Sequence, residues 1–370
     1  MTASSTRRVW FAGGGTGGHL YPGLAIARAL SARDPAFAPL FIGAERGIER
    51  EVLPTTEFPH TLLDLHPLYR HAPWNNWRTL FGAVSAWRAL SRLARMSRPE
   101  AVIGTGGYAA GVALAWARAH GVPTVLHEPD SHPGITTRTF AGGARAIYLG
   151  FAEASRFLSL SVGTDVRTLG APIETPPAQR PSRSTSRAVW DLPENTFVIL
   201  VFGGSQGARA LNEAMAAWCA HGLPEGVALI WATGRAQVAG YLDRESAMVR
   251  VRPYLSPIAN AYAAADLAIT RAGAMSIAEL CAWHIPSVLV PLPTSAQDHQ
   301  AHNATAIAAS GAAIHLPQSQ LGVARLESIV SDLRSHPNRL ADMRRAARAR
   351  ARPNAAADMA EALVALLSRE

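Results

Sequence analysis

The stretch Val9–His19, which reads VWFAGGGTGGH, places a run of glycines directly after four apolar residues. An apolar run that ends in glycines and leads into a helical pattern is typical of the first strand, turn and helix of a parallel α/β sheet. The following residues agree, because Pro22–Ala32 has the pattern of a helix and Pro39–Ile42 that of a second strand. We therefore predict a strand–turn–helix–strand unit whose turn is Gly13–His19.

The same pattern recurs further along the chain. A second unit is predicted from strand Ala101–Ile103, turn Gly104–Tyr108, helix Ala109–His120 and strand Thr124–His127. Glu174–Arg187, rich in Pro, Ser, Thr and Arg, breaks the pattern and is typical of an interdomain linker. The pattern then restarts with strand Val198–Phe202, turn Gly203–Gly207 and helix Ala208–Cys219, followed by strands Ala228–Ala232, Leu267–Ile269 and Ser287–Val290.

These units predict an α/β protein with two doubly wound domains. We expect an N-terminal domain at 1–173, a linker at 174–187 and a C-terminal domain at 188–350. A last helix at 351–370 is expected to pack back toward the N-terminal domain. In doubly wound sheets, ligands bind beyond the carboxyl ends of the strands, so the glycine turns are candidate binding sites.

The 370 residues carry a formal net charge of +8, and the chain contains arginine but no lysine. This excess of positive charge favours an anionic partner: nucleic acid, an acidic membrane surface or a phosphorylated substrate. The arginines are scattered and no nucleic-acid-binding motif is present, so we expect no nucleic acid. Cys219 and Cys281 lie in apolar helical contexts, and no Cys/His cluster has metal-site spacing. We therefore expect neither a disulfide nor a metal site.

No run of about 18 consecutive apolar residues is present, so we expect no membrane-spanning helix, and any membrane contact would be made from the surface. Met1–Arg8 lacks the apolar core of a signal peptide, so we expect a cytoplasmic protein. In Trp74–Arg98, apolar residues fall on one helical face and arginines continue along it. Such a stripe fits packing on the core, or contact with an anionic membrane. The patch predicted to contact the membrane contains Trp74, Trp77, Leu80, Phe81, Val84, Trp87, Arg88 and Arg92.

The first glycine turn has the form of an anion-binding loop. Glycine amides approach an anion closely, and the following helix adds its positive end. The turn also contains the G-x-G-x-x-G spacing of a dinucleotide site, so a nicotinamide-dependent dehydrogenase is an alternative. Against it, the second strand ends at Phe41–Ala44 without the acidic residue that binds ribose in such sites. His19 would place an imidazole at this turn, or would alternatively cap the helix.

Three later segments are candidate binding sites, each with a simpler alternative. Gly203–Gly207 places a serine hydroxyl among free amides, as a phosphate site does, but also fits a plain tight turn. Arg271–Glu279 leads into a helix N-terminus suited to a diphosphate, where Glu279 would accept hydrogen bonds from ribose or be an ordinary early-helix acid. Asp298–Asn303 offers polar side chains to sugar hydroxyls, or is a polar loop with Asp298 as a helix cap.

Six motifs resemble, in this order, those of the MurG family. They are Gly14–His19, Gly106–Tyr108, His127–Pro129, Gly203–Ala208, Arg271–Glu279 and Asp298–Gln300. The resemblance runs from about Arg8 to the helical tail. Members of this family are N-acetylglucosaminyltransferases that convert lipid I into lipid II in peptidoglycan synthesis, and so serve cell-wall biogenesis, cell shape and cell division. The resemblance implies a GT-B fold, in which two Rossmann-like domains face each other across a cleft.

The resemblance also implies roles for the matched residues, without a cofactor. The C-terminal domain would hold UDP-GlcNAc and the N-terminal domain the acceptor, undecaprenyl-pyrophosphoryl-MurNAc-pentapeptide. The implied donor contacts are Ser205, Ala274, Met275 and Ser276 for diphosphate, Glu279 for ribose, the Leu255 backbone for uracil, and His299 and Gln300 for GlcNAc. Ile277 and Ala278, in the same helix start, are further implied substrate contacts. The resemblance also implies that Thr16, Gly17 and Gly18 line the donor–acceptor crevice and that Tyr108 and Asp130 bind substrate.

The family further implies a peripheral protein on the cytoplasmic face of the inner membrane. Trp116 would then join the membrane patch, and proteins of cell-wall synthesis or division are candidate partners. Two positions depart from the family pattern, since Asp130 replaces an Asn and Glu174 replaces an Arg. Glu174 puts a negative charge where the family has an arginine that would pair with the pyrophosphate. Arg209 and Arg271 are candidates to supply the missing positive charge.

The implied reaction is an inverting displacement, in which the MurNAc C4 hydroxyl attacks the anomeric carbon of GlcNAc and UDP leaves. Helix N-termini and glycine amides would stabilise the leaving diphosphate without a metal. His19 is the candidate base because imidazole titrates near neutral pH, and Glu128 and Asp130 are alternatives. Another GT-B enzyme, such as an antibiotic glycosyltransferase or a UDP-GlcNAc epimerase, is an alternative function. So is a non-catalytic scaffold.

Overall fold

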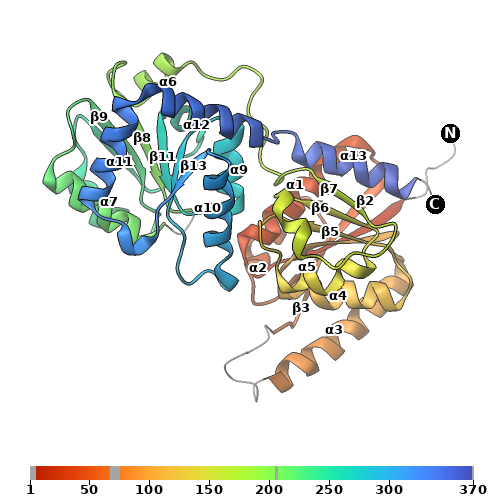
Figure 1. Ribbon diagram of the computed structural model, residues 1–370. Helices are drawn as coiled ribbons and strands as arrows, with labels where there is room; N and C mark the ends of the chain where they lie inside the picture. The colour runs from red at the N-terminus through yellow and green to blue at the C-terminus, as the bar shows by residue number, and fades with distance from the viewer. Residues whose placement is uncertain (1–5, 67–75, 205–206, 369–370) are drawn as a thin grey trace. The chain divides into compact units, whose positions relative to one another are not determined.

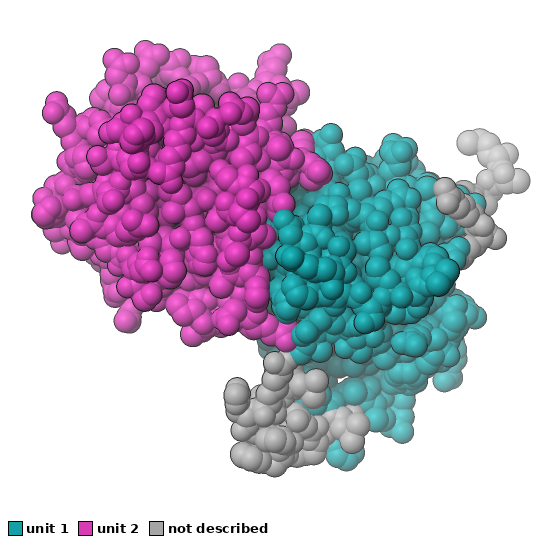
Figure 2. Space-filling model, in the orientation of Figure 1, with its two compact units in different colours: residues 1–173, 354–370 teal, residues 174–353 magenta. Residues whose placement is uncertain are grey.

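The computed structural model describes residues 6–66, 76–204 and 207–368. The chain divides into two compact units, coloured separately in Figure 2. Unit 1 comprises Met1–Ile173 and Asn354–Glu370, and unit 2 comprises Glu174–Pro353. Each unit is built on its own parallel sheet, as Figure 1 shows. The prediction of an α/β chain with two doubly wound sheets is confirmed.

In unit 1 the sheet order is β3-β2-β1-β4-β5-β6-β7, with every neighbouring pair parallel. The strands are β1 (Arg7–Gly13), β2 (Phe37–Ala44), β3 (His60–Leu63), β4 (Ala101–Gly106), β5 (Thr124–Glu128), β6 (Ala146–Leu149) and β7 (Asp165–Thr168). The helices are α1 (Gly17–Arg33), α2 (Glu49–Val52), α3 (Asn76–Met96), α4 (Gly107–Ala119), α5 (Ile135–Phe140) and α13 (Ala355–Leu367), with short 3-10 turns at Leu53–Thr55, Ala141–Gly143 and Ala152–Phe157.

Both faces of the unit 1 sheet are buried, which explains why β1 is apolar throughout. Val9 and Phe11 face a core that α1 and α13 complete, with Met359 and Leu363 among its buried residues. Trp10 and Ala12 face the opposite core, which α3 and α4 cover. The last helix of the chain therefore belongs to unit 1 and packs against its first helix.

In unit 2 the order is β10-β9-β8-β11-β12-β13, again parallel. The strands are β8 (Phe197–Phe202), β9 (Val227–Ala232), β10 (Val249–Arg252), β11 (Leu267–Thr270), β12 (Ser287–Leu289) and β13 (Ala313–His315). The helices are α6 (Arg183–Val189), α7 (Arg209–His221), α8 (Ala259–Ala264), α9 (Ala274–Ala282), α10 (His299–Ala309), α11 (Val323–Ser335) and α12 (Pro337–Arg350), with 3-10 turns at Val238–Gly240, Leu242–Arg244, Ala296–Asp298 and Gln318–Gln320.

Several boundaries differ from those that the sequence predicts. Helix α1 begins at Gly17, five residues before the predicted start, and contains Pro22. Glycines are poor helix formers and proline favours a first turn, so the pattern placed the start too late. The segment predicted as a linker, Glu174–Arg187, lies within unit 2 and ends in α6. The unpredicted strands β3, β6, β7, β10 and β13 have three or four residues each.

Candidate active site

The first glycine turn lies at the carboxyl end of β1, beside β4, where the strand order of unit 1 reverses direction. Gly14–Thr16 forms the turn, and His19 lies in the first turn of α1. Thr16 and Gly18 are exposed, and Gly17 and His19 are half-buried. Thr16 makes no side-chain capping bond to the helix, so its hydroxyl is not committed to that role.

The imidazole of His19 is held in one orientation by β4. Its Nδ1 lies 3.1 Å from the carbonyl oxygen of Thr105, and the Thr105 hydroxyl donates to the His19 carbonyl at 2.8 Å. A carbonyl oxygen can only accept, so Nδ1 carries the proton in this hydrogen bond. In the neutral ring Nε2 then has the lone pair, which is the tautomer that a general base at Nε2 requires.

The turn between β4 and α4 closes tightly over His19. Gly106 and Gly107 have φ values of 102° and 77°, which favour glycine. A Cβ on Gly106 would lie 2.5 Å from His19 Nδ1, and one on Gly107 would overlap with the Gly14 carbonyl. Tyr108 follows, and its ring packs closely on Gly15. A Cβ on Gly15 would lie 2.8 Å from Tyr108 Cε1. Gly15, His19 and Tyr108 are therefore brought together.

A buried acid that the sequence analysis missed supports the same turn. Glu49, at the start of α2, is fully buried, and its Oε1 accepts hydrogen bonds from Gly15 N at 2.8 Å and Ala44 N at 3.3 Å. Its Oε2 is buried without a hydrogen-bond partner among the described residues. Side chains at Gly14 or Gly47 would overlap with this carboxylate. Gly43 and Gly47, which shortly precede Glu49, were the only local signal in the sequence. The contact between Glu49 and Gly15 spans 34 positions.

Glu128 holds the loop that follows β5. Its Oε1 accepts from Asp130 N at 3.1 Å and its Oε2 from Gly134 N at 3.0 Å, and the residue is 4% exposed. Burial, followed by the charge of Asp130, raises the pKa of Glu128 to about 7. Because both oxygens bind the loop, this geometry favours a positioning role for Glu128 over a role as the base. Asp130 is half-buried on that loop.

Opposite pKa shifts at two neighbouring residues predict a compensated pH dependence of stability. Burial lowers the pKa of His127 to about 4, so its contribution to stability is lost as pH falls from 6.5 toward 4. The raised pKa of Glu128 has the opposite sign, because stability is lost as pH rises from 4.5 toward 7.

Replacing His127 by phenylalanine should remove only the loss of stability that occurs as pH falls from 6.5 toward 4. The difference in unfolding free energy between wild type and His127→Phe should then change by up to roughly 3 kcal/mol between pH 7 and pH 4. Urea unfolding at intermediate pH values measures this difference, and Glu128→Gln should give the opposite slope. Parallel stability curves for wild type and His127→Phe would contradict the burial argument.

The second glycine turn lies at the carboxyl end of β8 in unit 2. Ser205 lies outside the described residues, but Gly207, with φ of 76°, is placed so that a Cβ would overlap with the Thr233 carbonyl. Asn212 holds the contact, because its Nδ2 donates to Thr233 O at 2.8 Å and its Oδ1 accepts from Trp231 Nε1 at 2.9 Å. Gly207 is thus held against the end of β9.

The N-terminus of α9 lies at the end of the neighbouring strand β11. Gly273 precedes the helix, Ala274 and Ile277 are buried, and Met275, Ser276 and Ala278 are half-buried. Asn303 Nδ2 of α10 donates to the Ala272 carbonyl at 3.2 Å and so fixes this turn. Leu255, whose backbone was assigned to uracil, is 4% exposed and follows β10.

Glu279 is a half-buried carboxylate within α9. The Tyr262 hydroxyl donates to its Oε2 at 2.6 Å. Burial raises the pKa of Glu279, the Tyr262 hydrogen bond opposes this, and the charge of Glu174 raises it further. The residue that departs from the family pattern therefore acts electrostatically on the acid assigned to ribose.

Of the two arginines considered as replacements for the missing charge, Arg271 is unsuitable. Its guanidinium donates to the carbonyls of Val290 and Pro291 and, at 2.7 Å, to Gln318 Oε1, and the residue is buried. These donors are committed to the protein. Arg209 begins α7 directly after the glycine turn, and its exposed side chain pairs with Glu213. Arg209 is the better candidate.

The segment before α10 is strained. Gln297 and Asp298 have φ values of 55° and 52°, a left-handed conformation that side chains other than glycine rarely adopt. Asp298 makes no side-chain capping bond, so the alternative of a simple helix cap is not supported. His299 Nδ1 lies 2.8 Å from the Ala296 carbonyl, and Gln300 Oε1 accepts from Leu292 N at 3.0 Å. Strain of this kind concentrates at binding sites.

Helix α3 carries part of the predicted membrane patch. Phe81 is 69% exposed, Val84, Arg88 and Arg92 are also exposed, and their spacing places all four on one face, the α3 face. Trp87 is partly buried against the core. The prediction for Trp116 is wrong: it is 2% exposed, packs on Trp10 at 5.0 Å and donates to Ser91 Oγ. Trp74 and the side chains of Trp77 and Leu80 lie outside what the structure describes.

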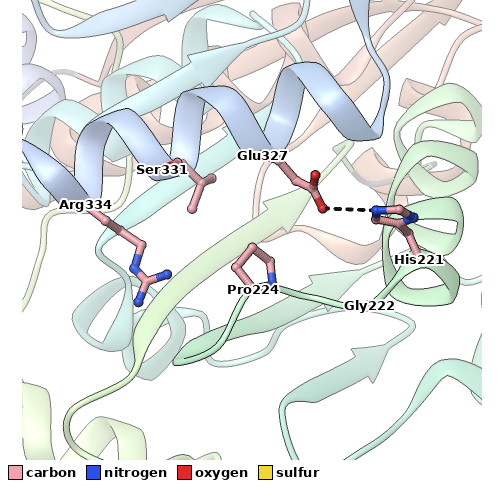
Figure 3. Close-up of a pocket in the computed structure, with 7 residues that line it drawn as sticks. His221, Gly222, Pro224, Glu327, Ser331 and Arg334 are labelled. Atoms are coloured by element: carbon pink, nitrogen blue, oxygen red, sulfur yellow. Dashed lines mark ion pairs between the residues drawn. The ribbon is translucent and has the colours of Figure 1, made fainter.

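Unit 2 also has a recess whose lining includes none of the predicted binding residues. It has a volume of about 320 Å³ between the end of α7 and helix α11, and its lining includes His221, Glu327 and Arg334 (Figure 3). Within 6–66, 76–204 and 207–368, no group of three or more His, Cys, Asp or Glu side chains is placed to hold a metal ion. No helix in these ranges is long and apolar enough to cross a membrane.

Comparison with known proteins agrees with this geometry. Residues 9–149 match the glycosyltransferase family 28 N-terminal domain and residues 198–361 the C-terminal domain. A UDP-N-acetylglucosamine–N-acetylmuramyl-(pentapeptide) pyrophosphoryl-undecaprenol N-acetylglucosamine transferase from Chlorobaculum tepidum is 37% identical over 97% of this chain and 99% of its own. The enzyme of the same name from Moorella thermoacetica is 38% identical over 94% and 96%.

Solved structures agree as well. The structure of MurG from Acinetobacter baumannii matches with a TM-score of 0.76 and 28% identity, covering 98% of this chain and all of that one. The calicheamicin glycosyltransferase CalG4 matches with a TM-score of 0.68 at 17% identity, over 98% of this chain and 99% of its own. The second likeness is one of fold alone.

Proposed function

We propose, because this chain belongs to the MurG family within glycosyltransferase family 28, that it transfers N-acetylglucosamine from UDP-GlcNAc to lipid I and so forms lipid II. The observation that carries this proposal is the match of 37% and 38% identity with enzymes of that name over nearly the whole chain. The chain is a glycosyltransferase. Its role is then in peptidoglycan synthesis.

The acceptor side of the reaction belongs to unit 1 in this proposal. Thr16, Gly17, Gly18, Tyr108 and Asp130 bind substrate, and His19 Nε2 takes the proton from the MurNAc C4 hydroxyl. The bond held by Thr105 supports this assignment, because it fixes the proton on the other ring nitrogen. As the C4 oxygen bonds to the anomeric carbon, the bond from that carbon to UDP breaks, with inversion.

The donor side belongs to unit 2. The start of α9 and the turn with Ser205 bind the diphosphate, where helix and glycine amides stabilise the charge that develops on UDP without a metal. Glu279 binds ribose, the backbone of Leu255 binds uracil, and His299 and Gln300 contact the GlcNAc hydroxyls. The strained backbone before α10 supports the last assignment.

Transfer from radiolabelled UDP-GlcNAc to a short-chain lipid I analogue tests the function. We expect a labelled disaccharide product and release of UDP, with little competition from UDP-GalNAc or UDP-glucose at equal concentration. A folded protein that binds UDP but gives no product with this acceptor would contradict the proposed acceptor. One that binds no UDP would contradict the donor assignment.

Replacing Glu279 by glutamine should weaken donor binding. A carboxylate makes stronger hydrogen bonds to ribose hydroxyls than an amide does, so we expect KM for UDP-GlcNAc to rise about tenfold with a smaller change in kcat. Tyr262→Phe is the matched control, because it removes the Oε2 partner but keeps the carboxylate. A lower kcat at unchanged KM in Glu279→Gln would assign this residue to the chemical step instead.

We also propose that the protein is peripheral to the cytoplasmic face of an anionic membrane, through the α3 face. Phe81→Ser should weaken co-sedimentation with phosphatidylglycerol vesicles about tenfold, because burial of one aromatic side chain is lost. Phe157→Ser is the control, since Phe157 is another exposed phenylalanine of unit 1 outside α3. Equal binding by both variants would remove α3 from the interface.

A further inference from the structure

Three arginines of unit 2 converge on one buried aspartate, at the end of the unit 2 sheet opposite the second glycine turn. Asp266 precedes β11, and its Oδ2 accepts from Arg187 Nη2 at 2.6 Å and from Val198 N at 2.9 Å. Its Oδ1 accepts from Arg344 Nη2 at 3.1 Å and also pairs with Arg183. One carboxylate therefore faces three guanidinium groups, and two positive charges are left over.

The three arginines differ in what else they bind. Arg187, with a side chain 4% exposed, also donates to the carbonyls of Ala264 and Glu194, so it serves the fold. The side chains of Arg183 and Arg344 are 46% and 38% exposed. Among the described residues, Asp266 is the only carboxylate that pairs with either of them. A guanidinium has five N–H donors, so most of theirs are available at the surface.

The surplus charge is repulsive within the protein. Burial and then the charge of Arg344 lower the pKa of Arg183, and burial followed by the charges of Arg183 and Arg344 lowers that of Arg187 to about 10. The exposed Arg348 lies one helical turn beyond Arg344 on α12. Helices α6 and α12 lie close together in Figure 1, linked through Asp266. We call Arg183, Arg344 and Arg348 the arginine cluster.

We propose that the arginine cluster binds a phosphate group, at the end of the unit 2 sheet opposite the second glycine turn. Two guanidinium forks that share one Asp266 oxygen lie close enough to bind the same tetrahedral anion, and Arg forms bidentate bonds with phosphate. The buried Asp266 and Arg187 fix the Arg344 and Arg183 side chains from below. A phosphate group offsets the surplus positive charge. Its source is either a free phosphate compound or the headgroup of an anionic lipid.

Thermal unfolding of the whole chain with inorganic phosphate tests the site. Chloride at equal ionic strength is the reference, and saturating UDP occupies the donor site on the proposed function, so phosphate cannot act there. We expect phosphate to raise the unfolding temperature of wild type, and Arg344→Gln to weaken the apparent phosphate affinity about tenfold. Arg339→Gln is the matched control, because Arg339 lies on the same helix and pairs with Asp332.

Arg348→Gln keeps the test informative if Arg344→Gln does not fold, because Arg348 has no ion pair with Asp266 among the described residues. It should also weaken the phosphate effect. Vesicles of phosphatidylglycerol, which is anionic, and of phosphatidylcholine, which is neutral overall, distinguish the two sources. If Arg344→Gln binds phosphatidylglycerol vesicles more weakly than Arg339→Gln does, and the two variants bind phosphatidylcholine vesicles equally, the site binds a lipid headgroup. A phosphate effect without this vesicle difference assigns it to a free compound. If the cluster variants match Arg339→Gln in both measurements, the proposal is overturned.

Discussion

Replacement of His19 by asparagine is expected to lower kcat by a factor of about 10²–10⁴, the usual contribution of a general base. Asparagine can still donate a hydrogen bond from the position of Nδ1 to the Thr105 carbonyl, but it has no counterpart of Nε2. The fold of the turn should therefore persist while the proton acceptor is lost. Initial rates with UDP-GlcNAc and a lipid I analogue measure the effect.

Two readouts separate the chemical role of His19 from a structural one. The dissociation constant of UDP should be unchanged in His19→Asn, because the donor residues of the proposal all belong to unit 2. The fall of kcat/KM at acid pH that the imidazole produces in wild type should be absent. If His19→Asn keeps more than a few per cent of kcat, the base lies elsewhere, and Asp130 becomes the first candidate because Glu128 is occupied by backbone amides.

Replacement of Glu49 by alanine is expected to be the most damaging change behind the glycine turn. It leaves Gly15 N and Ala44 N without their acceptor and opens a cavity, which should lower the unfolding free energy by about 2–4 kcal/mol. The displaced turn carries His19, and a displacement of about 1 Å costs on the order of 10²-fold in rate. Urea unfolding and steady-state kinetics measure the two effects.

Glu49→Gln is the matched variant, because it keeps an oxygen for Gly15 and places its amide where Oε2 has no partner among the described residues. We expect it to restore most of the stability and of kcat. UDP affinity should be the same in both variants, since Glu49 lies in unit 1. A glutamine variant as inactive as the alanine variant, yet stable, would show that the charge itself acts in the reaction.

The glycine turns and the strands before them could be predicted because their signals are local. A continuous apolar strand followed by glycines requires no knowledge of distant residues, and both β1 and β8 were placed from it. Strands β3, β6, β7, β10 and β13 gave no such signal, although β11 and β12, which are equally short, were predicted from their apolar runs. They form because neighbouring strands supply hydrogen-bond partners, as β12 does for β13 and β6 does for β7.

Contacts between distant parts of the chain could not be predicted. Helix α1 and strand β2 separate Glu49 from Gly15 along the chain, and no periodicity connects the two residues. Trp116 shows the same limit, because an aromatic residue near arginines fits a membrane surface or a core equally well. Its contact with Trp10 of β1 decides for the core. Arg271 is a similar case, because its place in the sequence fits a phosphate ligand but its guanidinium donates to the carbonyls of Val290 and Pro291.

The return of α13 to unit 1 has a consequence for folding during synthesis. Unit 2 is an insertion between the two parts of unit 1, and Met359, Leu363 and Leu367 complete a core that Val9 and Phe11 begin. The Arg7 guanidinium also donates to the Leu367 carbonyl. As the chain leaves the ribosome, unit 2 can fold first, whereas unit 1 must wait for the last residues with part of its apolar surface uncovered. Nascent chains of this protein should therefore need chaperone protection longest at their N-terminal half.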